Sequence, residues 1–329
     1  MKAWFLASRL RQVALAMTFM VMGTALGFAQ SFPQRGIKII MPFPAGGGAD
    51  VVGRAVAQQL SESLRQSVIV ENVVGAGGTI GTARAAQAAP DGYTLFVGTP
   101  STHGTNVAVY PKLSYDAIKD FVPIGLIATS PLMLIASPTL EVASVGDLIK
   151  LAREKPGELA YGSFGTGSIN HLAIELFQSM AGIKTNHIPY RGSAPAMTDL
   201  IAGRIQYTID GPAALTFIRA NTVKFLAVGS SKRWGFFPDK PTISESGVPG
   251  YEALTWFGLF APAGTPPVIV KLLNGKLNEA LATDHVKDSF RTLGVDAAGG
   301  TPTVLSTTVD NEIKKWVKIA TEKDIKIEP

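Results

Sequence analysis

Apolar positions along this chain alternate between short continuous runs and segments with a helical period. Residues 37–41 are an apolar run, residues 42–50 form the turn Pro-Phe-Pro-Ala-Gly-Gly-Gly-Ala-Asp, and the apolar residues that follow are three and four positions apart. Such spacing puts them on one face of a helix. The pattern predicts a strand, a glycine turn and a helix whose apolar face consists of Val52, Ala55, Val56, Leu60 and Leu64.

The glycines at 46–48 remove Cβ atoms where the predicted helix begins, so that a ligand can approach the backbone closely. The first N–H groups of a helix have no internal acceptor and carry the positive end of its dipole. This combination favours an anion, such as a carboxylate or a phosphate. Two other interpretations stay open: a tight turn that only redirects the chain, and a helix capped by the carboxylate of Asp50. The turn matches neither the P-loop nor the dinucleotide-binding motif.

Further strands, glycine turns and helices follow in the same order. Residues 67–71 are β-rich, 75–78 are a second glycine turn, and 79–89 are a helix of small residues. A strand at 93–98 ends in the polar loop 99–104. This alternation predicts an α/β fold with a mostly parallel sheet that is covered on both faces. Ligands of such sheets bind beyond the carboxyl ends of the strands, where both loops are expected.

A second α/β unit follows the apolar segment 121–137, which is too long for one strand and suits a crossing between domains. Strand 161–163 leads into the glycine loop 164–168 and a strongly periodic helix. Residues 187–193 form a similar passage from a strand through a glycine turn into a helix, and strand 205–210 ends in Asp210. Segment 251–261 is the expected return crossing, and the last two helices are expected to pack on the first unit. Two units joined by two crossings predict a cleft with opposed anion loops, suited to a ligand with two acidic ends or to one acid held from both sides.

The first 29 residues predict a secretory signal peptide. Lys2, Arg9 and Arg11 precede an apolar run, and small residues end at Ala29, where we expect cleavage. The alternative is a membrane anchor, but the run is shorter than the ~20 residues that a span needs. Cleavage leaves a formal net charge of +2, and no Lys/Arg cluster is interleaved with aromatics, so no nucleic-acid partner is expected.

The 329 residues include no cysteine, which excludes disulfides, thiolate chemistry and cysteine zinc sites. A large core without disulfides suits a periplasmic protein. The sequence has no G-x-S-x-G elbow, and its four histidines lack zinc spacing, so we expect no metal and no cofactor. Ser168 and His171 are three apart on a helix, which admits either a catalytic pair or an N-cap beside a loop-edge histidine. Trp256 and Phe257 line the cleft or, more simply, pack the crossing strand.

Several motifs occur in one order along the whole mature chain: PFPAGGGAD, VENVVGAGGTIG, APDGYTL, YGSFGTGSINHL, HIPYRGSAPAMTDLIAG and TWFGLFAPAGTP. Together they resemble the solute-binding receptors of tripartite tricarboxylate transporters, the Bug family. The resemblance implies a two-domain, type II periplasmic binding-protein fold with a hinge of two crossing segments. The implied domains are residues 30–130 with 254–329, and residues 131–253, after the signal peptide 1–29. It also implies that carboxylates are held by backbone N–H groups, hydroxyls and ordered water.

The resemblance also implies which positions bind the ligand. In the first domain they are the first glycine loop with the start of its helix, and the loop after strand 93–98; in the second they are the glycine loop, the Pro-Tyr-x-Gly-Ser motif and the strand-end acid. Arg191 stands at x, where lysine is common, and His103 and Asn170 occupy variable positions where ligand choice is expected to be set. The predicted ligand-binding residues are Phe43, Gly47, Gly48, Asp50, Thr99, Ser101, Gly165, Thr166, Ser168, Tyr190 and Asp210.

The sequence therefore predicts a periplasmic receptor, not an enzyme, that binds a small mono- or dicarboxylate and delivers it to the permease subunits of such a transporter. A ligand-sensing subunit for a periplasmic signalling domain is the alternative, and a hydrolase that uses Ser168 and His171 is a third. Citrate-like acids, acidic amino acids, nicotinate-like acids and aromatic dicarboxylates all fit a cleft with two anion sites.

Overall fold

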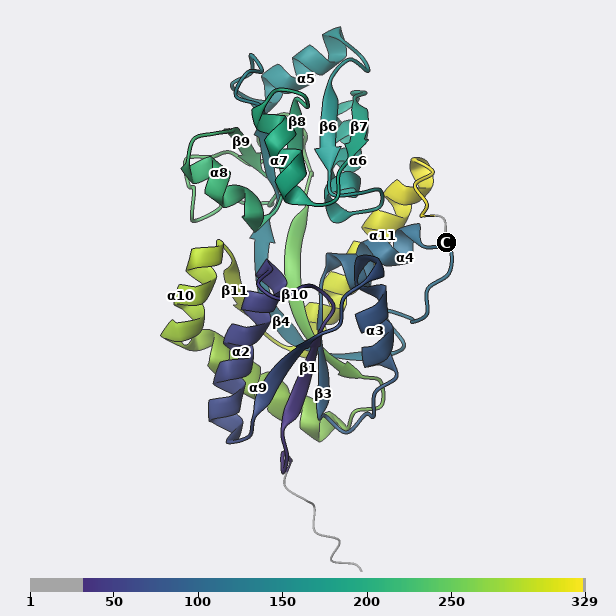
Figure 1. Cartoon of the computed structure of the whole chain (residues 1–329), viewed down its shortest axis with the longest axis vertical. Coiled ribbons are helices and arrows are strands. Elements are labelled where there is room, and N and C mark those ends of the chain that lie inside the picture. Colours follow the sequence, from purple (N-terminus) through teal and green to yellow (C-terminus); the bar gives the residue numbers. More distant parts are fainter. Residues whose placement is uncertain (1–31, 328–329) are drawn as a thin grey trace, which may run out of the picture. The chain divides into compact units, whose positions relative to one another are not determined.

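Two mixed β-sheets organise the part of the chain that the computed structural model describes, residues 32–327 (Figure 1). The predicted signal peptide lies outside these residues. The first sheet has six strands in the order β11-β4-β10-β3-β1-β2. Their bounds are β1 Ile37–Met41, β2 Val68–Asn72, β3 Thr94–Gly98, β4 Phe121–Pro131, β10 Leu254–Pro262 and β11 Asp296–Gly299.

The six-stranded sheet is parallel only in the part built first along the chain. Strand β1 pairs in parallel with β2 on one side and with β3 on the other. Strand β10 runs antiparallel to both β3 and β4, and β11 is antiparallel to β4. The prediction of a mostly parallel sheet is therefore wrong for this half, because the crossing strands enter the sheet with the opposite direction.

The second sheet has five strands in the order β7-β6-β8-β5-β9. Strand β6 is parallel to β7 and β8, whereas β5 is antiparallel to β8 and β9. Their bounds are β5 Met133–Ala136, β6 Ala160–Ser163, β7 Asn186–Pro189, β8 Tyr207–Asp210 and β9 Lys224–Val228.

The chain passes from one sheet to the other twice, as predicted. On the way out, β4 of the first sheet leads through Leu132 into β5 of the second. On the return, Ala253 precedes β10, and its carbonyl accepts a hydrogen bond of 3.1 Å from the N–H of Leu132. The two crossings are thus bonded to each other. The boundaries at 130/131 and 253/254 as domain limits stay a prediction.

Helices cover both faces of each sheet. Figure 1 shows α2, α9 and α10 on one side of the six-stranded sheet, and α3, α4 and α11 on the other. In the second half, α5 and α6 pack on one face of the sheet and α7 and α8 on the other. The helices are α2 Gly48–Leu64, α3 Thr79–Ala86, α4 Asn106–Val109, α5 Val145–Glu154, α6 Ile169–Ala181, α7 Ser193–Ile201, α8 Leu215–Arg219, α9 Pro267–Ala282, α10 Asp284–Leu293 and α11 Pro302–Glu322.

The apolar face predicted for the first helix is buried in α2, apart from the half-buried Leu64 at its end. Helix α11 links the halves, because Trp316 and Ile319 belong to the same core cluster as Leu172 and Phe177 of α6. Within residues 32–327, no helix combines the length and the apolar character that a membrane span requires.

Candidate functional site

The first predicted anion loop is open at the start of α2. Gly47 is the N-cap residue and has no side chain with which to cap the helix, and residues 44–48 are exposed. The N–H groups of Gly48, Ala49 and Asp50 occupy the first turn, which has no intrahelical acceptors. A carboxylate at this end meets unpaired donors and the positive end of a 17-residue helix.

Asp50 fixes the shape of this loop from behind. Its Oδ2 accepts hydrogen bonds from the Gly46 N–H at 2.9 Å and from Arg54 Nε at 2.8 Å, and its Oδ1 accepts one from Asn72 Nδ2 at 2.8 Å. Burial disfavours the charged form, but the bonds from Arg54, Gly46 and Asn72 outweigh it and hold the pKa of Asp50 below its usual value. With its oxygens so occupied, Asp50 holds the backbone of the loop for a ligand rather than contacting one itself.

The other loops of the first sheet lie against the first one. A methyl group added to Gly78 would lie 3.1 Å from Thr102 Cγ2 and 3.4 Å from the Phe43 ring, so three loops meet there. Asn72 Nδ2 also donates to the carbonyl of Phe43 at 2.9 Å. These contacts place Phe43 beside the segment that follows β3.

That segment is a π-helical turn, η2, at Ser101–Thr105. Ser101 is half-buried at its start, while Thr99 is 5 % exposed. Within residues 32–327, Thr99 Oγ1 and Thr105 Oγ1 are buried without a hydrogen-bond partner. Single π-turns inside helices are often found at functional sites, and two unpaired hydroxyls call for partners such as ligand or water.

The second glycine loop precedes α6 in the other half. Gly165 and Gly167 have φ of 119° and 76°, which other residues rarely adopt, so glycine is needed at both positions. Thr166 between them is exposed. Ser168 is the N-cap of α6: its Oγ accepts from the His171 N–H at 3.3 Å and donates to the Gly165 carbonyl at 2.7 Å.

Tyr190 and Asp210 lie at the ends of β7 and β8, the strands on either side of β6. The backbone N–H of Tyr190 donates to Ser163, and its hydroxyl donates to Asp199 Oδ2 at 2.8 Å. Asp210 ends β8, is 2 % exposed, and accepts hydrogen bonds from Ser193 Oγ at 2.9 Å and from the Gly211 N–H at 2.6 Å. Burial raises the pKa of Asp210 to about 7 despite these bonds, so its carboxyl is neutral in a large fraction of molecules near pH 7.

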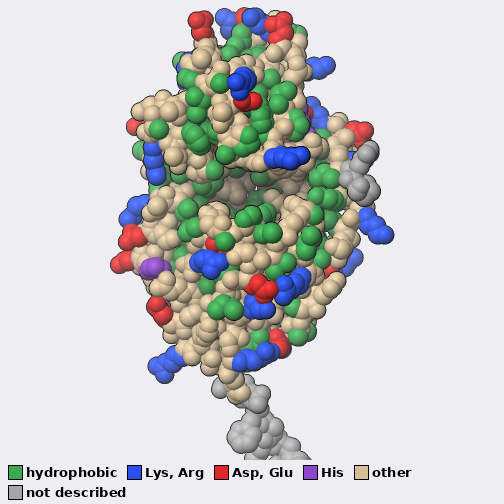
Figure 2. All heavy atoms as spheres, in the orientation of Figure 1, with side chains coloured by type: hydrophobic (Ala, Val, Ile, Leu, Met, Phe, Trp, Pro, Cys, Tyr) green, Lys and Arg blue, Asp and Glu red, His purple; other side chains and the backbone are tan. Residues whose placement is uncertain are grey.

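The glycine loop of the second half lies next to the first half. A methyl group added to Gly167 would lie 2.9 Å from Val109 of α4 and 2.9 Å from Ile327. Helix α4 follows η2 directly, and η2 itself contacts α6. Figure 2 shows the surface hollowed between the elements of the two sheets, with hydrophobic side chains around the margin. The structure therefore brings the loop with Gly165 to Ser168 beside the loop with Ser101.

Three histidines, His103, His171 and His187, pack against other aromatic rings. His103 is fully buried among Phe96, Phe121 and Phe260, and burial lowers its pKa to about 3. The rings of His171 and His187 stack with centroids 3.9 Å apart. In the described part of the chain, no group of three or more His, Cys, Asp or Glu residues is placed to hold a metal ion.

A Ser168–His171 catalytic pair does not form in this geometry. The Ser168 hydroxyl donates to a carbonyl, and His171 Nδ1 accepts from the Gly167 N–H at 3.1 Å. A different serine, Ser163, bonds the ring of a histidine, with 2.6 Å between its Oγ and His187 Nε2. Ser163 has no exposed surface, so a substrate cannot reach its hydroxyl.

Sequence reasoning missed the residues that support the loops. Asn72 and Arg54 hold Asp50, and Ser193 holds Asp210. Ser193 carried a usable signal, because it follows β7, which lies in the same sheet as β8 and is separated from it by β6, so both strand ends lie at one edge of the sheet. Arg54 also carried one, since it lies four residues after Asp50 on the same helix. For Asn72, the only signal in the sequence is its place at the end of a strand.

Comparison with known proteins identifies the family. Residues 52–325 match the model of the tripartite tricarboxylate transporter family receptors, so the chain belongs to this family. It is 39 % identical over 301 residues to the protein BugT of Bordetella pertussis, with 91 % of this chain and 92 % of BugT covered. The resemblance to Bug receptors is thus confirmed, and receptors of this family are periplasmic.

Solved structures agree with this assignment. The R. palustris protein Rpa4515, solved with adipate, superposes with a TM-score of 0.80 at 40 % identity, covering 90 % of this chain and 99 % of that one. MatC from Rhodopseudomonas palustris, solved with bound malate, gives a TM-score of 0.75 at 34 % identity, covering 88 % and 99 %. The fold is that of the two-sheet solute-binding receptors.

Proposed function

We propose that this protein binds a small carboxylate between the α2 glycine loop and the loop that precedes α6, and delivers it to the permease of a tripartite tricarboxylate transporter. The family is that of the transporter receptors, and the proposal adds the ligand class, the binding residues and the partner. The residues proposed to contact the ligand or to shape its site are Phe43, Gly47, Gly48, Asp50, Thr99, Ser101, Gly165, Thr166, Ser168, Tyr190 and Asp210.

The observation that carries the proposal is the uncapped start of α2. Gly47 and Gly48 are exposed, no side chain caps the helix, and Asp50 is held by three protein donors, one of them the cation Arg54. A donor set of this kind recognises a carboxylate without a cationic side chain. The exposed Thr166 supplies a further donor from the other half.

A dicarboxylate is the favoured ligand class. Helix N-termini are present in both halves, at α2 and at α6, and η2 of the first half contacts α6 of the second. The two structural relatives were solved with adipate and malate, which both carry two carboxylates. Support for two acidic ends thus comes from the fold and from the relatives.

A thermal-shift screen of the mature protein tests the ligand class. The protein is unfolded, dialysed and refolded to remove carried-over ligand, and then mixed with mono-, di- and tricarboxylates. A ligand that binds only the folded state raises the melting temperature by mass action. We expect a rise with a dicarboxylate. No rise with any acid, for protein shown by mass spectrometry to be ligand-free, would refute carboxylate binding.

Uptake and expression measurements test the partner. Deletion of the gene is expected to abolish uptake of the identified acid, and expression of the full chain is expected to restore it. Altered gene expression with unchanged uptake would instead support the signalling alternative. Mass spectrometry of the exported protein is expected to show Gln30 at the N-terminus, as cleavage after Ala29 predicts.

A further inference from the structure

The glycine loop that precedes α6 is held from inside the protein by two neighbouring histidines. The backbone N–H of Gly167 donates to His171 Nδ1 at 3.1 Å. The N–H of Gly165 donates to Ser163 Oγ at 3.3 Å, and the same oxygen lies 2.6 Å from His187 Nε2. Both glycines of the loop are therefore tied to an imidazole ring, one directly and the other through a serine.

The hydrogen bonds assign the protons of both rings. His171 Nδ1 accepts the Gly167 N–H, so this nitrogen carries no proton and the neutral ring carries its proton on Nε2. Ser163 Oγ also contacts the Gly165 carbonyl at 3.2 Å, and a hydroxyl has only one proton to donate. All three contacts of Ser163 are satisfied when it donates to this carbonyl and accepts from the Gly165 N–H and from a His187 Nε2–H.

The two imidazole rings pack on each other and on Tyr161. The ring centroids of His171 and His187 are 3.9 Å apart and their planes are inclined by 10°, while the Tyr161 ring lies 5.0 Å from that of His187. Burial and the neighbouring His187 lower the pKa of His171 to about 3, and burial lowers the pKa of His187 as well. Both rings are therefore neutral near pH 7, and His171 Nδ1 is free to accept.

This anchoring decides which N–H groups of the loop can meet a ligand. The N–H groups of Gly165 and Gly167 are used on protein acceptors, and that of Ser168 donates to the Gly165 carbonyl at 3.1 Å. Within residues 32–327, the N–H of the exposed Thr166 has no acceptor, and Ile169 begins α6, whose first turn provides no intrahelical acceptors. The donors left for an anion are those of Thr166 and Ile169.

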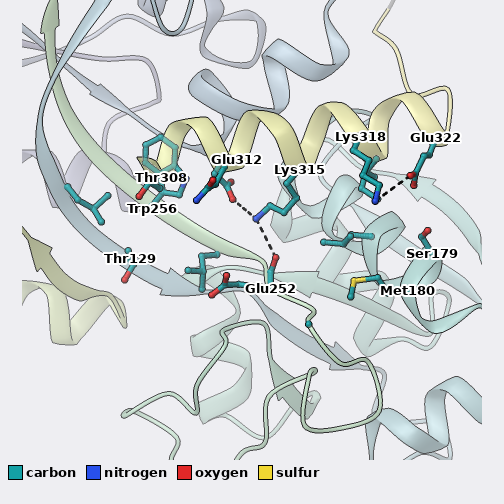
Figure 3. A pocket seen from close by; sticks show the side chains of 16 residues that line it. Thr129, Ser179, Met180, Glu252, Trp256, Thr308, Glu312, Lys315, Lys318 and Glu322 are labelled. Atoms are coloured by element: carbon teal, nitrogen blue, oxygen red, sulfur yellow. Dashed lines mark hydrogen bonds and ion pairs between the residues drawn. The ribbon is translucent and has the colours of Figure 1, made fainter. Parts of the chain in front are cut away.

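The lysines of a separate cavity along α11 are already paired. The cavity has a volume of about 570 Å³, and none of the proposed carboxylate-binding residues lines it. Figure 3 shows the two described lysines of its lining beside glutamates of the same helix, Lys315 with Glu312 and Lys318 with Glu322. The glycine loop before α6 is therefore the better place for a second carboxylate.

We propose that His171 and His187 are positioning residues that fix this loop for one of the two carboxylates of the ligand. They act through the loop backbone, because they hold the free N–H groups of Thr166 and Ile169 in one fixed arrangement. The inference rests on the proposed function and deepens it, since it assigns one acidic end of the ligand to this loop. Loss of either histidine's hydrogen bond lets the loop relax and weakens the binding of that end, while the start of α2 still binds the other.

Two substitutions of His171 separate its hydrogen bond from its ring. His171→Phe keeps an aromatic ring but has no acceptor, whereas His171→Asn loses the ring and keeps an acceptor oxygen near the position of Nδ1. Calorimetry with a panel of dicarboxylates that includes adipate and malate measures affinity, and urea unfolding measures stability. We expect His171→Phe to bind about tenfold more weakly than wild type and His171→Asn to bind within about threefold of it. His285→Phe is the control, because His285 is exposed on α10.

A purely structural histidine would give the opposite order. Affinity would then follow stability, and His171→Asn, which loses the buried ring, is expected to be the less stable variant. Wild-type affinity in His171→Phe, or weaker binding in His171→Asn than in His171→Phe, would overturn the inference and leave the proposed function standing. Wild-type protein that bound no dicarboxylate in the panel would overturn both.

Monocarboxylate probes test the assignment of the second acidic end. Hexanoate replaces one carboxylate of adipate by a methyl group, and 2-hydroxybutyrate does the same for malate. The preference of wild type for the diacid over its matched monoacid is expected to fall about tenfold in His171→Phe and to stay unchanged in His285→Phe. An unchanged preference in His171→Phe would overturn the assignment. His187→Phe and His187→Gln repeat the comparison at the other ring, since glutamine supplies an N–H donor near the position of Nε2.

Discussion

The carboxylate of Asp50 accepts a hydrogen bond of 2.9 Å from the backbone N–H of Gly46, four residues earlier in the chain. This contact ties the glycine loop to the first turn of α2, whose end it leaves uncapped. Asp50 therefore does not cap the first N–H groups of α2, and these groups remain available to an anion. Loop shape and anion access depend on the same side chain.

Asp50→Ala is expected to weaken both folding and ligand binding. The substitution removes the acceptor of Arg54 Nε and one of the two acceptors of Asn72 Nδ2, and loss of a buried charge-assisted hydrogen bond costs about 1–3 kcal/mol. Urea unfolding measures the first effect and calorimetry the second. Asp147→Ala is the control, because Asp147 forms a comparable capping box on α5, in the other half. Equal ligand affinity in Asp50→Ala and wild type would contradict the role assigned to Asp50.

Gly47→Val is expected to weaken carboxylate binding strongly while the fold persists. A Cβ at Gly47 would lie 3.4 Å from the Pro44 carbonyl, and the backbone there has a φ of −73°, so a side chain fits the loop. A β-branched side chain nevertheless blocks approach to the helix N–H groups. Loss of one or two such contacts weakens binding about 10–100-fold. Gly235→Val is the control, because a Cβ there meets open space, and unchanged affinity in Gly47→Val would place the site elsewhere.

Asp210 is expected to make stability depend on pH between about 4 and 7. Its pKa in the folded state, about 7, is above the ordinary 3.8, so the folded protein binds the extra proton in this window and stability falls as pH rises through it. Asp210→Asn imitates the neutral form. The unfolding free energy of the variant minus that of wild type is therefore expected to increase by up to about 1.4 kcal/mol per pH unit in this window and to level off above it. If the difference in unfolding free energy did not change with pH, the Asp210 carboxyl would not be neutral in the folded protein.

The same group is expected to set the pH dependence of ligand binding. Above pH 7 the Asp210 carboxylate becomes charged and repels a ligand carboxylate nearby, so wild-type affinity should fall. Calorimetric titrations from pH 6 to pH 8.5 would show this fall in wild type but not in Asp210→Asn. A parallel fall in both proteins would mean that a different group responds.

Ser168→Ala is expected to cost stability and to reveal no lost catalysis. The Ser168 side chain caps α6, and removing such a cap costs about 1 kcal/mol. Because the hydroxyl does not contact the His171 ring, no ester turnover is expected from wild type in a p-nitrophenyl ester assay. Turnover that disappears in Ser168→Ala would revive the hydrolase alternative.

The sequence predicted the elements whose own residues determine them. The face of α2, the strand before it and the two glycine loops follow from periodicity and glycine placement. Strand β11 was not predicted, because Asp-Ala-Ala-Gly has little strand propensity and becomes a strand only by pairing with β4. Likewise, the antiparallel half of each sheet depends on where the crossings enter.

The site was predicted less completely than the fold. Glycine loops can be recognised in the sequence. The contact between Gly167 and Val109 cannot, because it joins residues 58 positions apart through tertiary packing. For Trp256 the sequence admitted core packing or cleft lining, and core packing is confirmed: the side chain is 1 % exposed and belongs to the core cluster that includes Phe96 and Phe260.

Calorimetric titration of ligand-free mature protein with adipate and with malate is the sharpest test of carboxylate binding at the start of α2, with Gly47→Val measured in parallel. We expect saturable one-to-one binding of at least one of a panel of dicarboxylates that includes these two, strongly weakened in the variant. Ligand-free, folded protein that binds no carboxylate in the panel, or that binds one equally well with Gly47→Val, would contradict it.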